Sequence, residues 1–302
     1  MMNSMIGYHY TNLKALESIL ESQTIRLGSS LTMDDPLDEF FGPLCAILYF
    51  TDKNLSELKK SFPGELVPDL ILESFDKNLN VDFFSVSFCQ SYKNKTLWDT
   101  YANQGKGVAI GFDLGKILDY VNDVNKNCQF CEEIYLKLVE IQYGYKEIEI
   151  ENEIERIIHE TKTSSNMSAP SISSVFSYLW YFLAGKYKSK FWEEQQETRL
   201  LFKSFYRYNE EKLEKPSEND NEFIKLEKLG SEEMKEKLEE LGLMPIKQQG
   251  AKKYCDFSLK GIWKLNIIPI IYVANQETKE NVEKIIKQYP ELAKTKVLLY
   301  KL

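Results

Sequence analysis

The stretch that decides the fold is "YHYTNLKALESILESQTIRL", which runs from Tyr8 to Leu27. The aromatic-rich segment 8–11 predicts a short strand, and Asn12 is a candidate N-cap residue for a following helix. The apolar residues of that helix recur at helical spacing, at Leu13, Leu16, Ile19 and Leu20. A second short strand is predicted at 24–27, so the chain opens as strand, helix, strand. The first strand carries His9, one of only two histidines.

Length and composition predict a soluble globular protein. The chain has 302 residues, of which 43% are hydrophobic, so it can bury a sizeable core. The 38 basic and 46 acidic side chains give a net charge of -8, which excludes a global positive field for nucleic acid or an anionic membrane. A polyanion would therefore have to bind a local patch. The longest apolar run, near 178–184, is too short to span a membrane.

The cysteines favour reduced thiols in a cytoplasmic protein. There are five, an odd number, and they are scattered through a chain without a secretion signal. Cys128 and Cys131 form a C-x-x-C pair, but no second pair or nearby histidine completes a zinc site, and we predict no metal site. The G-x-G-x-x-G, phosphate-loop, H-E-x-x-H and G-x-S-x-G motifs are all absent from the sequence.

Patterning further along the chain predicts a single α+β domain over residues 1–302. Strands are expected at 83–89, 108–112, 136–143, 197–203, 267–273 and 296–300, and helices at 97–102 and 276–288. Residues 145–190 are predicted to be a mainly helical insertion. Residues 205–255 are rich in Lys and Glu and are predicted to be a charged, partly helical insertion.

Four stretches carry chemical content: "YHYT" at 8–11, "DDPLDEF" at 34–40, "LWDTYANQGKGVAIGFD" at 97–113 and "KYKSKFWEEQQETRLLF" at 186–202. Together they resemble the bacterial domain-of-unknown-function family 2971, and the resemblance extends over nearly the whole chain. Two positions depart from the pattern of that family. Asp34 stands where Asn is usual in the acidic loop, and Thr198 replaces the aromatic residue before Arg199.

The opening stretch is also similar to the start of DarT-type ADP-ribosyltransferases that modify DNA, and more loosely to the RNA 2'-phosphotransferases. The early histidine, a central aromatic residue and a late glutamate follow the order of the His-Tyr-Glu and Arg-Ser-Glu triads in that fold. This resemblance implies an ADP-ribosyltransferase-like split β core of two small, mostly antiparallel sheets with flanking helices and helical insertions. It further implies that NAD binds as a substrate between the two sheets.

The chemistry of NAD cleavage suggests a role for each candidate. Nicotinamide leaves the ribose through an oxocarbenium-like state, so the site needs a fixed carboxylate, and Glu197 is the catalytic candidate. Strand alternation places Glu197 and Arg199 on one face, where Arg199 would bind a pyrophosphate or hold Glu197 ionised. A surface cross-strand charge pair is the alternative for these two residues.

The remaining candidates would bind the cofactor. A neutral His9 imidazole would hydrogen-bond the ribose or the carboxamide, with Thr11 on the same side and Ser87 directing a hydroxyl into the cleft. Trp98 and Tyr101 would form an aromatic wall for the nicotinamide ring. The alternatives are that His9 is a buried imidazole tied to a backbone carbonyl and that the two aromatic residues belong to the core.

Lys186, Lys188 and Lys190 alternate beside two aromatic residues just before Glu197. They would lead a nucleic-acid or protein acceptor toward the cleft, unless they form a solvated turn. We therefore expect an ADP-ribosyltransferase acting as a toxin or phage-defence effector, with an antitoxin or immunity partner. The alternatives are a catalytically inert nucleotide- or protein-binding sensor domain and an NAD glycohydrolase.

Overall fold

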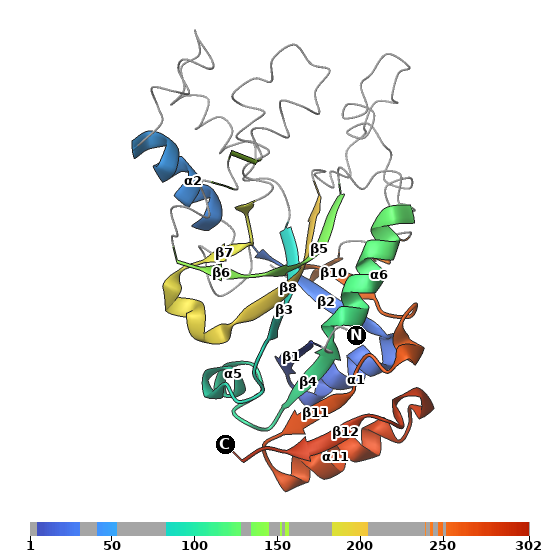
Figure 1. Cartoon of the computed structure of the whole chain (residues 1–302). Helices are drawn as coiled ribbons and strands as arrows, with labels where there is room; N and C mark the ends of the chain where they lie inside the picture. The colour runs from blue at the N-terminus through green and yellow to red at the C-terminus, as the bar shows by residue number, and fades with distance from the viewer. Residues whose placement is uncertain are drawn as a thin grey trace.

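The computed structural model describes residues 5–30, 41–52, 83–127, 134–144, 183–204 and 252–301, with short pieces at 152, 155–156, 239, 242–243 and 247–249. It is a mixed α+β structure, as predicted. Helices pack against one ten-stranded, mostly antiparallel sheet, and two short strands form a second sheet (Figure 1). Within the described part, no helix is both long enough and apolar enough to cross a bilayer.

The opening stretch folds as strand, helix, strand, which confirms its prediction. β1 (Ile6–Thr11) leads into α1 (Leu13–Ser22) and then β2 (Thr24–Ser29). Asn12 caps the helix, because its side-chain oxygen accepts from the Ala15 N–H at 2.9 Å. The helix ends at Gln23 in the left-handed conformation, with φ 53°. Its apolar stripe is buried, so α1 is fixed against the sheet.

The remaining elements follow in chain order: α2 (Phe41–Asp52), β3 (Phe83–Cys89), α5 (Lys95–Thr100), β4 (Val108–Asp113), α6 (Leu114–Asn127), β5 (Ile134–Glu140), β6 (Gln142–Tyr143), β7 (Tyr187–Lys188), the 3-10 helix η2 (Lys190–Gln195), β8 (Glu197–Ser204), β9 (Lys247–Gln249), β10 (Lys252–Ser258), η3 (Trp263–Leu265), β11 (Ile270–Val273), α11 (Gln276–Ile286), η4 (Pro290–Leu292) and β12 (Lys296–Leu299). β9 and most of β10 lie within the segment predicted to be a charged insertion, so the end of that segment belongs to the main sheet.

The sheet divides at β3. β8 pairs along the whole length of β3, from Phe83 to Cys89, and so occupies one edge of that strand. The other edge is shared, because β2 pairs with Phe84 and Ser85 whereas β1 pairs with Cys89. We call this division the fork. One arm continues from β1 through β4 and β11 to β12, and the other from β2 through β10 to β9. The strands thus join into one forked sheet, in contrast to the two small sheets expected.

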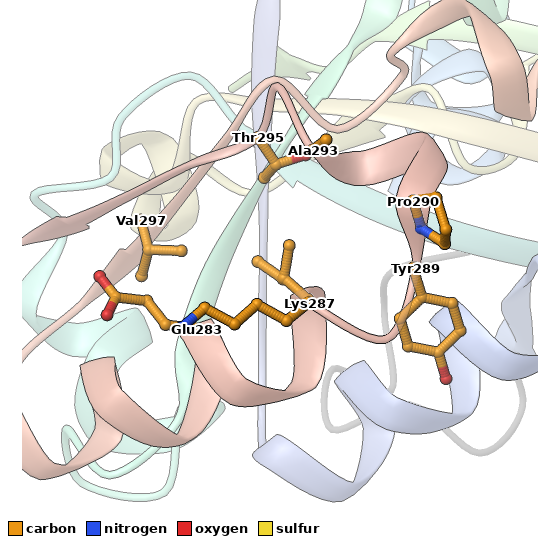
Figure 2. A pocket seen from close by; sticks show the side chains of 8 residues that line it. Glu283, Lys287, Tyr289, Pro290, Ala293, Thr295 and Val297 are labelled. Atoms are coloured by element: carbon orange, nitrogen blue, oxygen red, sulfur yellow. The ribbon is translucent and has the colours of Figure 1, made fainter.

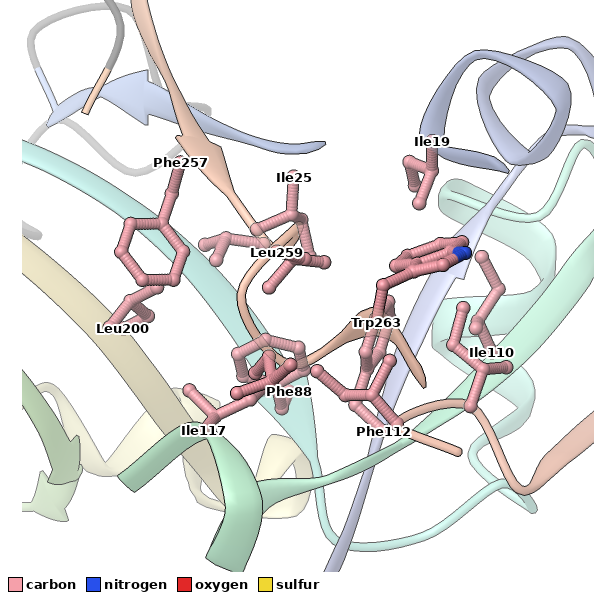
Figure 3. Packing of buried hydrophobic residues seen from close by; sticks show 14 of the residues in the cluster. Ile19, Ile25, Phe88, Ile110, Phe112, Ile117, Leu200, Phe257, Leu259 and Trp263 are labelled. Atoms are coloured by element: carbon pink, nitrogen blue, oxygen red, sulfur yellow. The ribbon is translucent and has the colours of Figure 1, made fainter. Parts of the chain in front are cut away.

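The main core lies on one face of the sheet. Val86, Phe88, Leu200 and Phe202 of β3 and β8 face it, together with buried residues of α1, α6 and α11. Trp263 packs into this cluster, as Figure 3 shows. On the other face, α5 covers the β1 arm with a smaller apolar cluster of Tyr10, Cys89, Leu97, Trp98, Ala102 and Ala109. The same face of β3 and β8 carries polar residues, which β7 and η2 cover.

Candidate functional site

The register of β3 and β8 brings several polar side chains together on one face of the pair. Ser87 lies opposite Arg199, and Cys89 lies opposite Glu197. Directly opposed residues share a face of an antiparallel pair, and side chains alternate along each strand. Ser87, Glu197 and Arg199 therefore project from one face, whereas Leu200 projects into the main core. The register places Glu197 and Arg199 on one face of the strand, as predicted.

Glu197 lies at the centre of a buried ionic cluster. Its Oε1 accepts a hydrogen bond from Lys188 Nζ at 2.8 Å. Its Oε2 accepts from Arg199 Nε and from the Ser87 hydroxyl, each at 2.9 Å. The backbone N–H of Glu197 donates to the Tyr143 hydroxyl at 2.8 Å. Both carboxylate oxygens thus have a cationic donor, which fixes the orientation of the carboxylate.

The two cations keep Glu197 ionised. Burial alone would raise the pKa of its carboxyl, but the charges of Arg199 and Lys188 and their hydrogen bonds outweigh that effect and lower the pKa to about 2. Glu197 is therefore a carboxylate at neutral pH and cannot act there as a general acid. Of the two roles considered for Arg199, the geometry matches the one in which the guanidinium holds Glu197 ionised.

Lys188 was missed as a partner of Glu197. It is 6% exposed, and its ammonium donates to Gln195 Oε1 at 3.1 Å and lies 5.2 Å from the centroid of the Trp192 ring. Lys186 is half-buried and Lys190 is exposed, so the three lysines do not form one basic surface. Their even spacing in the sequence gave no signal that the middle one turns inward. Gln195 and Tyr143 likewise lacked any motif that would have identified them.

A strained residue directs the chain into the site. Gln196 has φ 42°, in the left-handed region that residues other than glycine seldom adopt. Its N–H donates to the Glu193 carbonyl, and its own carbonyl accepts from the Gln90 N–H at 3.1 Å. These bonds anchor the turn between η2 and β8, so Glu197 becomes the first residue of the strand. Such strain is often found where a functional group needs a fixed position.

His9 contacts the fork. Its Nδ1 lies 3.2 Å from the Ser87 carbonyl oxygen, and because a carbonyl can only accept, Nδ1 carries the proton and Nε2 is the acceptor of the neutral ring. Burial lowers the pKa of His9, although the bond to Ser87 opposes the shift. Tyr8 pairs with Cys89 on the face of Glu197, so His9 leaves β1 from the opposite face. The imidazole is tied to a backbone carbonyl, as in the alternative considered above.

Ser87 connects the two halves of the site. Its carbonyl accepts from His9, and its hydroxyl donates to Glu197. We call this arrangement the His9–Ser87–Glu197 series. Ser87 and His9 are both partly exposed, whereas Glu197 is buried. The Ser87 hydroxyl and the Glu197 carboxylate lie on one face of the sheet, and the His9 side chain leaves β1 on the other face.

The other predicted residues lie apart from this series. Trp98 is fully buried, and its Nε1 donates to the Tyr92 carbonyl at 2.8 Å. Tyr101 follows the last residue of α5 and is 42% exposed. These positions do not place the two rings on one wall. Thr11 is buried at the end of β1, opposite Val108.

A separate pocket of about 410 Å³ lies at α11, η4 and β12 (Figure 2). It contains none of the predicted site residues; its lining is Glu283, Ile286, Lys287, Tyr289, Pro290, Ala293, Thr295 and Val297. Among the residues that the structure describes, no group of three His, Cys, Asp or Glu could hold a metal ion. The acidic loop at 34–39, Cys128, Cys131 and most of both predicted insertions lie outside the described residues.

Comparison with known proteins gives one match. Neither a curated protein nor a solved structure matches the chain, so the likeness to DarT-type enzymes has no support from these comparisons. The model of a family described as "Protein of unknown function (DUF2971)" matches residues 97–200. This segment runs from α5 into β8 and includes Glu197 and Arg199, but not His9 or Ser87. Over these residues, the chain is similar to that family of proteins of unknown function.

Proposed function

We propose that this chain is an ADP-ribosyltransferase-like enzyme that cleaves NAD and transfers ADP-ribose to a nucleic acid or protein acceptor. The observation that carries the proposal is the His9–Ser87–Glu197 series. Histidine on the first strand, serine on a central strand and glutamate at the start of a late strand combine the first residue of the His-Tyr-Glu triad with the last two of the Arg-Ser-Glu triad, in the same order along the chain. Ser87 takes the middle position for which Tyr101 had been considered. The single forked sheet differs from the two small sheets of that fold, so the proposal rests on the series and not on the sheet.

Each residue of the series would have a separate role in the reaction. Cleavage of the bond between nicotinamide and ribose develops positive charge on the sugar, which a fixed carboxylate stabilises best in a site of low dielectric constant. Glu197 is buried and ionised, and would supply that charge. The Ser87 hydroxyl would orient the carboxylate and approach the ribose. His9 Nε2 would accept a hydrogen bond from a ribose hydroxyl or from the carboxamide.

One observation favours a second candidate, a catalytically inert nucleotide- or protein-binding module. Two cations, Lys188 and Arg199, contact the carboxylate of Glu197 from the same side of the sheet. Buried cationic side chains next to Ser87 could bind a phosphate group without requiring any reaction. In that case Glu197 would serve to organise the two cations.

Incubation of the purified chain with NAD separates these functions. Release of nicotinamide together with labelling of a macromolecule supports transfer, whereas release of nicotinamide with free ADP-ribose identifies an NAD glycohydrolase. NAD or a nucleotide that binds in calorimetry without turnover identifies the binding module. The acceptor is found by adding radiolabelled NAD to separate nucleic-acid and protein fractions.

Three substitutions test the role of the series. Glu197→Gln should reduce turnover by about 10²–10³-fold, because a neutral amide cannot stabilise the developing cation. Ser87→Ala should also reduce turnover, and it leaves the ion pairs of Glu197 in place. Glu194→Gln is the matched control, because Glu194 is exposed on η2 and its side chain has no hydrogen bond or ion pair in the part of the chain described. Equal turnover in Glu197→Gln and Glu194→Gln, with both variants folded, would contradict the mechanism.

A further inference from the structure

Four partly exposed tyrosines from distant segments meet on the face of the β1 arm that α5 borders. They are Tyr8 on β1, Tyr92 after β3, Tyr272 on β11 and Tyr300 after β12, and we call them the tyrosine surface. The Tyr92 and Tyr272 rings stack in parallel, with centroids 3.7 Å apart. Tyr8 meets both rings edge-on at 5.5 and 5.8 Å, and Tyr300 meets Tyr92 at 5.4 Å. Figure 1 shows α5, β1, β11 and the C-terminus in this region.

Small residues of β4 leave space for these rings. Gly111 lies opposite Tyr8, and Ala109 lies opposite both Tyr10 and Tyr272. Because β4 carries no large side chain at these positions, the larger rings from its two neighbouring strands can meet above it. Burial and the neighbouring Tyr92 raise the pKa of Tyr272 to about 12. The Tyr272 hydroxyl is therefore neutral at physiological pH and adds no negative charge to the surface.

Lysines border the tyrosine surface. The Lys93 ammonium lies 5.5 Å from the centroid of the Tyr92 ring, and Lys301 directly follows Tyr300. Lys93 and Lys301 are both exposed, as is Lys95 at the start of α5. These positive charges are local, because the chain as a whole has a net charge of -8. An acidic protein binds a polyanion through local positive charges of this kind.

We propose that the tyrosine surface binds single-stranded nucleic acid. Unpaired bases stack on aromatic side chains irrespective of sequence, and lysines beside the rings neutralise the phosphates. The surface combines both features, with four rings and adjacent lysines. Duplex DNA is a poorer ligand, because its bases are already stacked on one another inside the helix.

The position of the surface connects it to the candidate site. Tyr8, Cys89 and Glu197 lie side by side on β1, β3 and β8, on the same face of the sheet. Two strand spacings, or about 10 Å, separate the backbone positions of Tyr8 and Glu197. A nucleic-acid strand bound to the tyrosines would therefore lie about 10 Å from the position on β8 that carries Glu197. Its role as the acceptor of ADP-ribose rests on the proposed function, whereas its binding does not.

Fluorescence anisotropy with a labelled single-stranded oligonucleotide of about 12 nucleotides tests the binding. Tyr92→Leu and Tyr272→Leu should each weaken binding by about 5- to 150-fold, the equivalent of one lost stacked base. Lys93→Ala should weaken binding less and reduce its salt dependence. Tyr254→Leu is the matched control, because Tyr254 is a partly exposed tyrosine beneath Arg26 on the other arm of the fork.

Two results would overturn the proposal: no oligonucleotide binding by the unsubstituted chain at low salt, or affinities in Tyr92→Leu, Tyr272→Leu and Lys93→Ala that equal the affinity of Tyr254→Leu. The exposed Lys93 keeps the test valid even if a tyrosine variant unfolds. Because the assay contains no NAD, its result is independent of turnover. Oligonucleotide binding without NAD cleavage would support the tyrosine surface and contradict the proposed function. NAD cleavage without oligonucleotide binding would support the proposed function and contradict the tyrosine surface.

Discussion

Leu200 and Arg199 are neighbours on β8 and are both buried, but they lie on faces of the β3 and β8 pair that differ in chemistry. Leu200 is 0% exposed on the core face, and its neighbour Arg199 is 2% exposed on the polar face. Burial of the leucine lowers the free energy of the folded state directly. Burial of the guanidinium carries a desolvation penalty that the contact with Glu197 must offset. The core face, with Leu200, thus stabilises the fold, whereas the polar face, with Arg199, costs stability. We place the function on the polar face.

Arg199→Met should give the largest loss of stability, about 3–5 kcal/mol, because it removes one partner of a buried ion pair. Urea denaturation followed by circular dichroism measures the loss. Arg199→Lys is the control, since it keeps the charge and should cost less. Equal losses in the two variants would show that the charge of Arg199 is not what stabilises this face.

Leu200→Ala should lower the free energy of unfolding by about 2–5 kcal/mol through the cavity it creates.

The pH dependence of the stability loss should distinguish Leu200→Ala from Arg199→Met. The pKa of Glu197 is lowered to about 2, so its pairing stabilises the fold fully above the ordinary value of 4.5 and progressively less as pH falls toward 2. The deficit of Arg199→Met should therefore shrink at about pH 3.5, whereas that of Leu200→Ala should not. Parallel shrinkage in both variants would contradict the assignment.

Ser87→Ala should cost less, about 1–2 kcal/mol, because Glu197 loses one of three hydrogen bonds but keeps both cations. The bond of His9 to the Ser87 carbonyl is preserved in this variant. Thermal unfolding measures the effect. A loss as large as that of Arg199→Met would indicate that the hydroxyl, and not the ion pairs, organises the site.

Substitution of His9 should have the smallest effect on stability. Burial lowers its pKa below the ordinary value of 6.5, so the unfolded chain binds a proton more readily than the folded one. The contribution of His9 to stability is therefore complete above pH 6.5 and decreases as pH falls below it. His9→Gln can still donate to the Ser87 carbonyl but does not titrate, and its stability should change less than that of the unsubstituted chain when the pH is lowered to about 5.5. Identical pH profiles would exclude His9 as the titrating group.

The sequence predicted the strands that carry the site but not their arrangement. β3 was predicted with its observed bounds because its β-branched and aromatic residues favour a strand. The fork depends on pairing between segments far apart in the chain, for which the sequence alone contains no signal. Alternation placed His9 and Thr11 on one face of β1 without indicating which face that was. Tyr101 was assigned to the face of Trp98, but it is the C-cap residue of α5 and is 42% exposed, whereas Trp98 is buried.

The fork also sets an order of events during synthesis. β1, α1 and β2 leave the ribosome first, but β2 pairs with β10, whose last residue is Ser258, and β4 pairs with β11, which ends at Val273. The inner strands β1, β4, β2 and β3 can pair early, but both arms are completed only when most of the chain has been made. During that interval the early strands have unpaired edges, which makes the nascent chain prone to aggregation. Truncation after residue 250 should accordingly give an insoluble product and not a smaller folded domain.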